Sequence, residues 1–272
     1  MRIPFTALLA LATTVALAFL ALPLASLFLR VAPGELVSSL ASQPARDALL
    51  VSLKTNLIAE ALILLVGTPT AYLLARRRFR GRSLVLTLVE LPLVLPPAVG
   101  GIALFAAFGR TGLVGDELGA LGVSLPFTQA AVVVAVVFVA SPFYVRPAVA
   151  AFEAVDENVV EAARTLGAGP ARVFARVALP LAAGGLAAGA GVAFARGLGE
   201  FGATIMFAGS LQGLTQTLPL AIYAEFERDF SVALALGGLL VVISFAILLS
   251  IKLVPSWTRY ALPSSFHSAT SS

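Results

Sequence analysis

Residues 161–180 read Glu-Ala-Ala-Arg-Thr-Leu-Gly-Ala-Gly-Pro-Ala-Arg-Val-Phe-Ala-Arg-Val-Ala-Leu-Pro. This polar segment lies between two long apolar stretches of a chain that is 59% hydrophobic. A charged side chain is costly within the hydrocarbon of a membrane, yet the segment carries Glu161, Arg164, Arg172 and Arg176. We therefore expect it to lie outside the membrane and to contact another protein.

The same segment has the signals of two short helices separated by a turn. Ala162, Ala163 and Leu166 fall on one side of the first helix. Gly167 can end that helix in the left-handed conformation, and Pro170 suits the first turn of the next helix. The alternative interpretation is a short helix that lies on the membrane surface.

The whole chain has the composition of an integral membrane protein. It has 272 residues, a mean hydropathy of +0.99 and only 12% charged residues, against about 25% in soluble domains. It contains no cysteine, and its one histidine, His267, lies in a Ser-rich end, which argues against thiolate chemistry, histidine catalysis and histidine metal sites. The net charge of +4 comes from basic residues between apolar stretches, a pattern that indicates membrane topology and not nucleic-acid binding.

Six segments are long and apolar enough to cross the bilayer as helices. They lie near residues 5–29, 49–75, 84–108, 128–149, 181–208 and 232–254. Their apolarity is continuous, whereas strands of a membrane barrel alternate, so the sequence predicts an all-α membrane protein. We expect residues 1–30 to form a separate first helix, residues 31–260 a core with a cytoplasmic loop at 153–180, and residues 261–272 a disordered tail.

The basic residues predict the orientation, because cytoplasmic loops carry an excess of Lys and Arg. One set of loops holds 12 of them: Arg2, Arg76, Arg77, Arg78, Arg80, Arg82, Arg146, Arg164, Arg172, Arg176, Lys252 and Arg259. The opposite set holds 5: Arg30, Arg46, Lys54, Arg110 and Arg228. Both termini and residues 161–180 are therefore expected on the cytoplasmic side.

No part of the chain predicts a nucleotide-binding domain. The loops are too short to house one. The Gly-x-x-x-x-Gly-Lys-Ser/Thr pattern is absent, since the only lysines are Lys54 and Lys252. If transport here uses ATP, another chain supplies the site.

The third span contains a helix-breaking stretch. Residues 90–97 read Glu-Leu-Pro-Leu-Val-Leu-Pro-Pro, and proline in a helix interior removes a backbone hydrogen bond and clashes with the preceding turn. The helix must kink or open here. Broken helices often line transport pathways, although plain bending is an equal alternative, and Glu90 can lie near the cytoplasmic arginines 76–82. Glu60 in the second span is similarly ambiguous.

The fifth span carries an acid and a base. Residues 196–202 read Arg-Gly-Leu-Gly-Glu-Phe-Gly. The three glycines match the dinucleotide-binding pattern, but no strand precedes them, so we take them as a site of close packing or a local break. Arg196 and Glu200 are four residues apart and can pair on one helix face. Such a pair within the membrane marks either a pathway or a permanent structural contact.

The cytoplasmic segment resembles the EAA loop of ABC-importer permeases. The matching residues are Glu161-Ala162-Ala163, Gly167 after three further residues, and Val177 ahead of Leu179-Pro180. In that family the loop forms the coupling helix, which lies in a cleft of the ATPase subunit. The resemblance implies that the coupling residues here are Glu161, Ala162, Ala163, Arg164, Leu166 and Gly167.

Four stretches resemble a narrower group, the molybdate importer permeases. They are residues 91–97 (Leu-Pro-Leu-Val-Leu-Pro-Pro), 164–169 (Arg-Thr-Leu-Gly-Ala-Gly), 199–205 (Gly-Glu-Phe-Gly-Ala-Thr-Ile) and 217–223 (Thr-Leu-Pro-Leu-Ala-Ile-Tyr). The resemblance covers about residues 50–255. Sulfate and thiosulfate permeases share the second stretch and much of the third, while the fourth favours molybdate, with tungstate as an equivalent cargo.

The resemblance implies a fold, partners and a location. The fold is the type I (MetI-like) importer permease, with six transmembrane helices and the first one wrapped around the core. The partners are a second copy of the chain, two cytoplasmic ABC ATPase subunits that bind ATP and Mg, and an external oxyanion-binding protein. The chain itself needs no cofactor, performs no catalysis, binds no nucleic acid, and lies in a prokaryotic cytoplasmic (inner) membrane. It moves its cargo by alternating access.

The fifth span and the broken part of the third span are expected to line the route. The candidate path or gate residues are Pro92, Pro96, Pro97, Arg196, Gly199, Glu200, Gly202, Met206 and Phe207. A proton-coupled secondary transporter is the competing class, and it would use Glu60, Glu90 or Glu200 as a proton carrier. Against it stand the coupling loop at 161–180 and the lack of a detectable repeat between the two halves of the chain.

Overall fold

The computed structural model describes residues 5–31 and 33–260, and every regular element within them is a helix. The elements are α1 (Phe5–Leu29), α2 (Pro33–Leu40), α3 (Gln43–Arg76), α4 (Arg82–Val94), α5 (Pro97–Phe108), α6 (Gly115–Ala120), α7 (Gln129–Glu153), α8 (Glu157–Thr165), α9 (Pro170–Val173), the π-helical turn η1 (Phe174–Ala178), α10 (Leu179–Leu198), α11 (Gly202–Ala208), α12 (Leu218–Phe226) and α13 (Phe230–Tyr260). The all-α fold class is confirmed. The expected tail at 261–272 and His267 lie outside the described residues.

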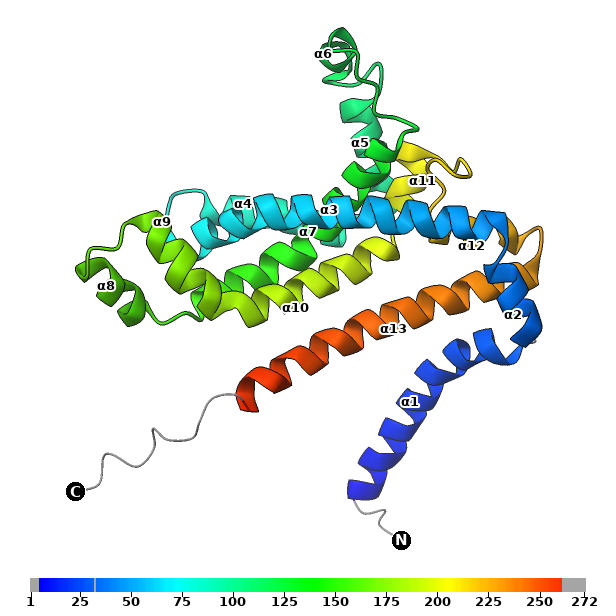
Figure 1. Ribbon diagram of the computed structural model, residues 1–272, viewed down its shortest axis with the longest axis horizontal. Helices are drawn as coiled ribbons and strands as arrows, with labels where there is room; N and C mark the ends of the chain where they lie inside the picture. Colours follow the sequence, from blue (N-terminus) through cyan, green and yellow to red (C-terminus); the bar gives the residue numbers. More distant parts are fainter. Residues whose placement is uncertain (1–4, 32, 261–272) are drawn as a thin grey trace.

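The core is a bundle of α3, α7 and α10 (Figure 1). Small residues bring these helices together, as is common where lipid removes the hydrophobic drive between helices. A Cβ atom on Gly67 of α3 would lie 2.9 Å from the ring of Tyr144 in α7, and one on Gly185 of α10 would lie 2.5 Å from the Ala151 methyl. The glycines therefore set the spacing of the bundle.

Among the described residues, five helices are long and apolar enough to span the membrane, and a sixth span is formed if the bent pair α4 and α5 counts as one. Residues 84–108 do not form one helix. They form α4 and α5, which meet at 117°, because Leu95 is extended ahead of Pro96 and a residue before proline avoids the helical region. The break predicted from the prolines is thus present, and it is too sharp for plain bending.

The expected fifth span, 181–208, is also divided. Its helix ends at Leu198, and residues 199–201 lead into the separate helix α11. The physical reason is local: the Glu200 carboxylate accepts a hydrogen bond of 2.7 Å from the Ala203 backbone N–H, which satisfies the new helix start. At its other end α10 continues from η1 and α9, so the helical rod begins at Pro170.

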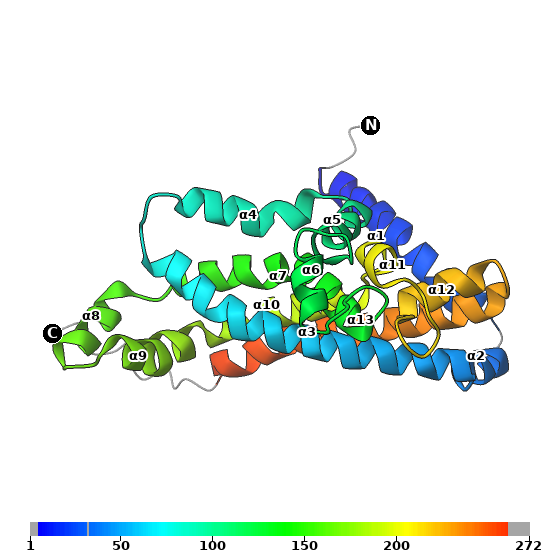
Figure 2. The ribbon, with the colours of Figure 1, turned by 90° about the horizontal axis from the view of Figure 1, so that it is seen from above.

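The two ends of the bundle carry different segments. The α3–α4 turn, α8 and α9 lie at one end, and α2 with α12 lies at the other (Figures 1 and 2). For these segments this is the grouping that the basic residues predict for the cytoplasmic and external loops, whereas α5 and α6 project from the side of the bundle (Figure 1). The first helix, α1, packs against α13, and Phe28 lies 3.1 Å from the place of a Cβ on Gly238. None of its described residues is buried.

Candidate functional site

The 153–180 segment folds as predicted from its local signals. Asp156 caps α8, because its Oδ1 accepts 2.9 Å from the Asn158 N–H. Gly167 ends the helix region with φ +83°, a conformation that side chains avoid, and no atom lies within 4 Å of where its Cβ would be. Pro170 begins α9. The glycine is therefore needed for its backbone angle and not for space.

The helix α8 has one buried side and one exposed side. Val160 is fully buried, and Ala163 packs partly against the core. Ala162 and Glu161 are exposed, and Leu166 is 88% exposed. Of the three residues predicted on one side, Ala162 and Leu166 are exposed, and Ala163 lies at the edge of that side nearest the core. An exposed leucine beside an exposed alanine at the end of the molecule is a surface suited to a partner protein.

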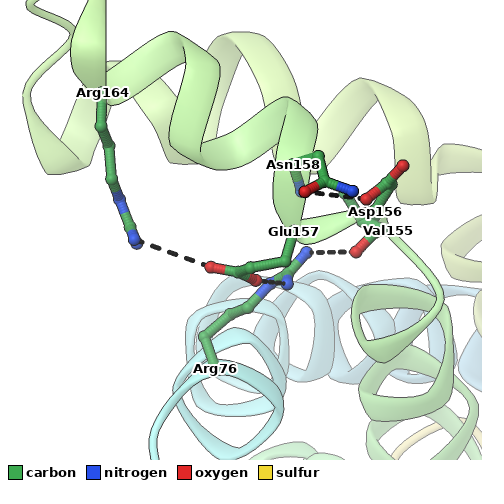
Figure 3. Close-up of polar contacts among 6 residues, drawn as sticks. All are labelled: Arg76, Val155, Asp156, Glu157, Asn158 and Arg164. Atoms are coloured by element: carbon green, nitrogen blue, oxygen red, sulfur yellow. Dashed lines mark hydrogen bonds and ion pairs between the residues drawn. The ribbon is translucent and has the colours of Figure 1, made fainter.

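An ion cluster fixes α8 to the end of α3 (Figure 3). The Arg76 guanidinium pairs with the Glu157 carboxylate, and its other arm donates 2.9 Å to the Val155 carbonyl. Glu157 also faces Arg164 at 3.6 Å. The Arg76 side chain is only 11% exposed, so its charge is held in place by these partners. Sequence reasoning missed this cluster, since Arg76 and Glu157 are 81 residues apart and nothing local links them.

A second layer lies beneath the cluster. Rings of Tyr72, Phe152 and Phe174 meet with centroids 4.8 to 6.3 Å apart. They come from α3, α7 and η1, so the π-helical turn is packed into the bundle at the point where the cytoplasmic segment becomes α10. Single π-turns occur often at functional sites, and no feature of the sequence predicted this one.

The two predicted breaks, which are about 100 residues apart in sequence, contact each other. A Cβ on Gly202 would lie 2.8 Å from the Pro97 Cβ, and a Cβ on Gly101 would lie 2.6 Å from the Ala203 carbonyl. Proline at the start of α5 and glycine at the start of α11 therefore fit together with no room for a further methyl group. The sequence predicted the break in the third span and left close packing or a local break open for the fifth, and it gave no sign that the two places meet.

Arg196 and Glu200 form the predicted pair, at 2.7 Å, across the end of α10. The Glu200 side chain is 1% exposed and that of Arg196 is 26% exposed. The arginine also lies over the Phe143 ring, 5.8 Å from its centroid. Glu200 uses one oxygen for this ion pair and the other to cap α11. The pair therefore connects the end of α10 to the start of α11, and we call this connection the α10–α11 joint.

Asn56 is a further polar contact at this joint, and it was not singled out from the sequence. Its side chain donates 3.0 Å to the Phe194 carbonyl, and a side chain on Gly197 would collide with its oxygen. Ser52, one turn earlier, accepts 2.7 Å from the Leu218 N–H. A polar residue within an apolar span is itself a signal, and attention to Asn56 would have found the contact.

The remaining predicted residues lie apart from one another. Phe207 is fully buried, with its ring centroid 6.5 Å from those of Phe105 and Phe108, whereas Met206 is 46% exposed. Gly199 ends α10 with open space around it. Pro92 lies in α4 and lines a cavity between α3 and α7.

The two other carboxylates of the spans differ. Glu90 pairs with Arg146 of α7 at 3.0 Å, which links α4 to α7. Glu60 is partly buried, and its Oε1 has no hydrogen-bond partner within the described residues. Across those same residues, no group of three or more acidic or histidine side chains could hold a metal ion.

Comparison with known proteins identifies relatives along most of the chain. Residues 67–262 match the family model described as binding-protein-dependent transport system inner membrane component. The molybdenum transport system permease protein ModB of Mycobacterium tuberculosis is 45% identical over 233 residues, which cover 86% of this chain and 88% of that protein. ModB of Escherichia coli K12 is 39% identical over 217 residues, covering 79% of this chain and 94% of that protein.

Solved structures show the same fold at lower identity. A chain of a bacterial alginate ABC transporter, crystallised with an alginate-bound periplasmic protein, superposes with a TM-score of 0.69 at 19% identity, covering 90% of this chain and 91% of that chain. A chain of the MetNI methionine ABC transporter in an inward-facing conformation gives 0.60 at 21% identity, covering 78% of this chain and 97% of that chain.

Proposed function

The chain belongs to the family of binding-protein-dependent transport system inner membrane components, a multi-pass inner membrane protein with the type I ABC-importer fold, and from that membership we propose that it carries molybdate into the cytoplasm. The observation that supports this cargo is the 45% identity, along 86% of the chain, to a protein named as a molybdenum transport permease. Tungstate, a tetrahedral dianion of the same type, is proposed as an equivalent cargo.

The proposed assembly supplies what this chain lacks. It consists of a second copy of the chain, two cytoplasmic ABC ATPase subunits that hold ATP and Mg, and an external binding protein that delivers the oxyanion. The exposed side of α8, with Glu161, Ala162 and Leu166, is the proposed docking surface for the ATPase. Its backbone is fixed at the Asp156 cap and at Gly167, so the surface is presented in one shape.

Two connections run from that surface to the contact between α5 and α11. One is the helical rod of α9, η1 and α10, which begins at Pro170 after the turn that follows α8 and ends at Leu198, just before Glu200 and α11. The other is α3, which holds α8 through Arg76 and holds the end of α10 through Asn56. These two residues are 20 positions apart, about 30 Å along a helix. Because both connections are stiff, we propose that movement of α8 against the ATPase shifts the α5–α11 contact and so alternates access.

The Arg196–Glu200 pair is proposed as a joint and not as the oxyanion site. Glu200 would repel a dianion, and the charge of Arg196 is already neutralised by it at 2.7 Å. Dissociating the pair for each cargo ion would leave the nearly unexposed Glu200 without its partner, at a cost of several kcal/mol. If the pair stays intact, α11 can change its angle to α10 while its first residues stay attached to Glu200.

Reconstitution in liposomes tests the proposal. The chain, a candidate ABC ATPase and a candidate oxyanion-binding protein are combined, and ATP hydrolysis and uptake are measured with molybdate, tungstate and sulfate. Stimulation by molybdate and tungstate, with sulfate inactive, is the expected result. Stimulation by sulfate alone would change the cargo to that of the sulfate and thiosulfate permeases, which share residues 164–169 and much of 199–205. Uptake that follows a proton gradient without any ATPase would replace the mechanism by a secondary transporter.

A further inference from the structure

A groove of about 490 Å³ runs between α3, α4 and α7. Its walls are mostly apolar and include Val66, Leu88, Pro92 and Phe138, with the Thr70 and Ser141 hydroxyls among them. The groove exists because α4 packs against α7 and stands away from α3 (Figure 2). These segments belong to candidate membrane spans and the lining is mostly apolar, so an apolar occupant is favoured.

The turn that closes one end of this groove is strongly basic. Residues 77–80 read Arg-Arg-Phe-Arg. The flanking Arg76 and Arg82 are engaged by Glu157 and Glu153. In the part of the chain that the structure describes, Arg77, Arg78 and Arg80 are exposed and have no carboxylate within 4 Å. Three adjacent unpaired cations repel one another and favour an anion.

The distance of Arg77, Arg78 and Arg80 from the groove matches the distance between the acyl chains and the headgroups of a bilayer. Thr70, which lines the groove, is seven residues before Arg77, about 10 Å along the helix. The headgroup region on each side of a bilayer is about 5–8 Å thick. Phe79 between the arginines is 42% exposed, and exposed aromatic rings typically mark the interface. The cations thus lie at the depth of headgroups while the groove lies at the depth of acyl chains.

We propose that the groove and the turn bind an anionic phospholipid, with one acyl chain between α3 and α4 and the phosphate on Arg77, Arg78 and Arg80. The N-terminus of α4 adds to this site, because its cap residue Gly81 supplies no side-chain hydrogen bond and a helix start attracts anions. The inference is independent of the cargo proposed above.

The size of the groove opposes the alternative occupant, a helix from another copy of the chain. A helix about 10 Å across has a cross-section near 80 Å², so 490 Å³ would hold only about 6 Å of it. A helix would also bring no negative charge to the arginines unless it carried acidic residues. An acyl chain with a phosphate satisfies both parts of the site.

Native mass spectrometry of the purified chain with phosphatidylglycerol or phosphatidylcholine tests the headgroup contact. The triple variant R77Q/R78Q/R80Q is expected to lose retained phosphatidylglycerol at least about fivefold, with phosphatidylcholine unchanged. The matched control is R172Q/R176Q, which removes two exposed arginines of the same predicted side that lie away from the groove. Equal retention by the triple variant and the wild type, or equal loss in the control, would overturn the proposal.

A second pair of variants tests the acyl-chain contact. Val66→Trp fills the groove and is expected to lower phosphatidylglycerol retention, whereas Leu65→Trp is placed next to it on a 72% exposed position outside the groove and should leave retention unchanged. Glycerol phosphate, which has no acyl chain, should fail to displace the lipid. If Val66→Trp changes only the oligomeric state, the groove belongs to a second copy and the lipid proposal is rejected.

Discussion

Glu200 is the most deeply buried charged side chain in the described residues, and it serves two contacts at once. Its carboxylate pairs with Arg196 and caps α11 through the Ala203 N–H. A charge in this position is tolerated because both oxygens have a partner of positive character. Glu200 therefore lies at the boundary between the two helices: α10 ends just before it, and its carboxylate caps the start of α11.

Substitutions at Glu200 should separate these two contacts. Glu200→Gln keeps an oxygen for the cap but loses the ion pair, and Glu200→Ala loses both. We expect a loss of about 1–3 kcal/mol for the glutamine variant and about 1 kcal/mol more for alanine, the usual value of a cap. Thermal unfolding in detergent measures the stability, and vesicle uptake measures the function.

The double variant Arg196→Gln/Glu200→Gln is the informative control. If the pair is a joint, the double variant should recover part of the stability lost in Glu200→Gln and retain oxyanion selectivity. Normal stability combined with abolished uptake or altered selectivity would show instead that Arg196 touches the cargo.

Two glycines three residues apart should respond differently to a methyl group. A Cβ at Gly202 would lie 2.8 Å from Pro97, whereas the nearest atom to a Cβ at Gly199 is 3.8 Å away. Gly202→Ala should therefore force α5 and α11 apart and cost about 1–3 kcal/mol, with slower uptake. Gly199→Ala should be close to wild type. The same unfolding and uptake assays compare them, and equal effects of the two would refute the close contact.

Among the helices, α8 shows the clearest division into one side that contacts the bundle and one side that is exposed. Val160 and the Glu157 cluster hold it to the bundle, and the opposite side faces outward. This division makes Ala162 a better probe of docking than Ala163, because Ala163 packs partly against the core.

Ala162→Arg should abolish binding of the ATPase and leave folding intact. The position is exposed, so the longer side chain does not disturb the bundle, but it would occupy the proposed docking surface. Co-purification with the ATPase after extraction from the membrane is the measurement. Wild-type co-purification together with normal uptake would remove α8 from the coupling role.

The Arg76–Glu157 link should matter for coupling more than for stability. Neutralising both residues, Arg76→Gln/Glu157→Gln, removes the ion pair between α8 and α3 and leaves no charge on either member; only the exposed Arg164 loses its 3.6 Å carboxylate contact. We expect ATP hydrolysis to continue while oxyanion moved per ATP falls several-fold. The matched control is Arg82→Gln/Glu153→Gln, which breaks a 2.7 Å pair between the start of α4 and the end of α7. A similar fall in both double variants would mean that the pairs only support the fold.

The segments that connect the long helices lie at two opposite ends of the helical bundle. The arginine-rich turn 77–80 and α8 lie at one end, and α2 with α12 lies at the other (Figure 1). The charge distribution predicts that the first of these ends is cytoplasmic. The lack of native cysteine makes the orientation directly measurable.

Single introduced cysteines should label according to this orientation. Thr165→Cys at the end of α8 and Thr111→Cys after α5 are both exposed positions. A membrane-impermeant maleimide added to intact right-side-out vesicles should modify Thr111→Cys alone, and after lysis it should modify both. Labelling of Thr165→Cys in intact vesicles would invert the topology and place α8 away from any cytoplasmic ATPase.

Much of the architecture could be read from local chemistry. Continuous apolar runs predict membrane helices, the prolines at 96 and 97 predict the break between α4 and α5, and Gly167 followed by Pro170 predicts the turn after α8. Each of these depends on interactions within a few residues, so the sequence carries them directly. The division of the fifth span was harder, because Glu200 can pair in an unbroken helix as well as cap a new one.

The sequence by itself determined the class of protein, the order of its apolar segments, the break of the third span at its prolines, and the resemblance to importer permeases. Only the tertiary structure decided that the two breaks contact each other, that Arg76 holds Glu157, that Asn56 holds the end of α10, and that α4 stands away from α3 to leave a groove. These features join residues tens to more than a hundred positions apart. Local propensity and spacing carry no information on such pairs, because they depend on how small residues let whole helices approach.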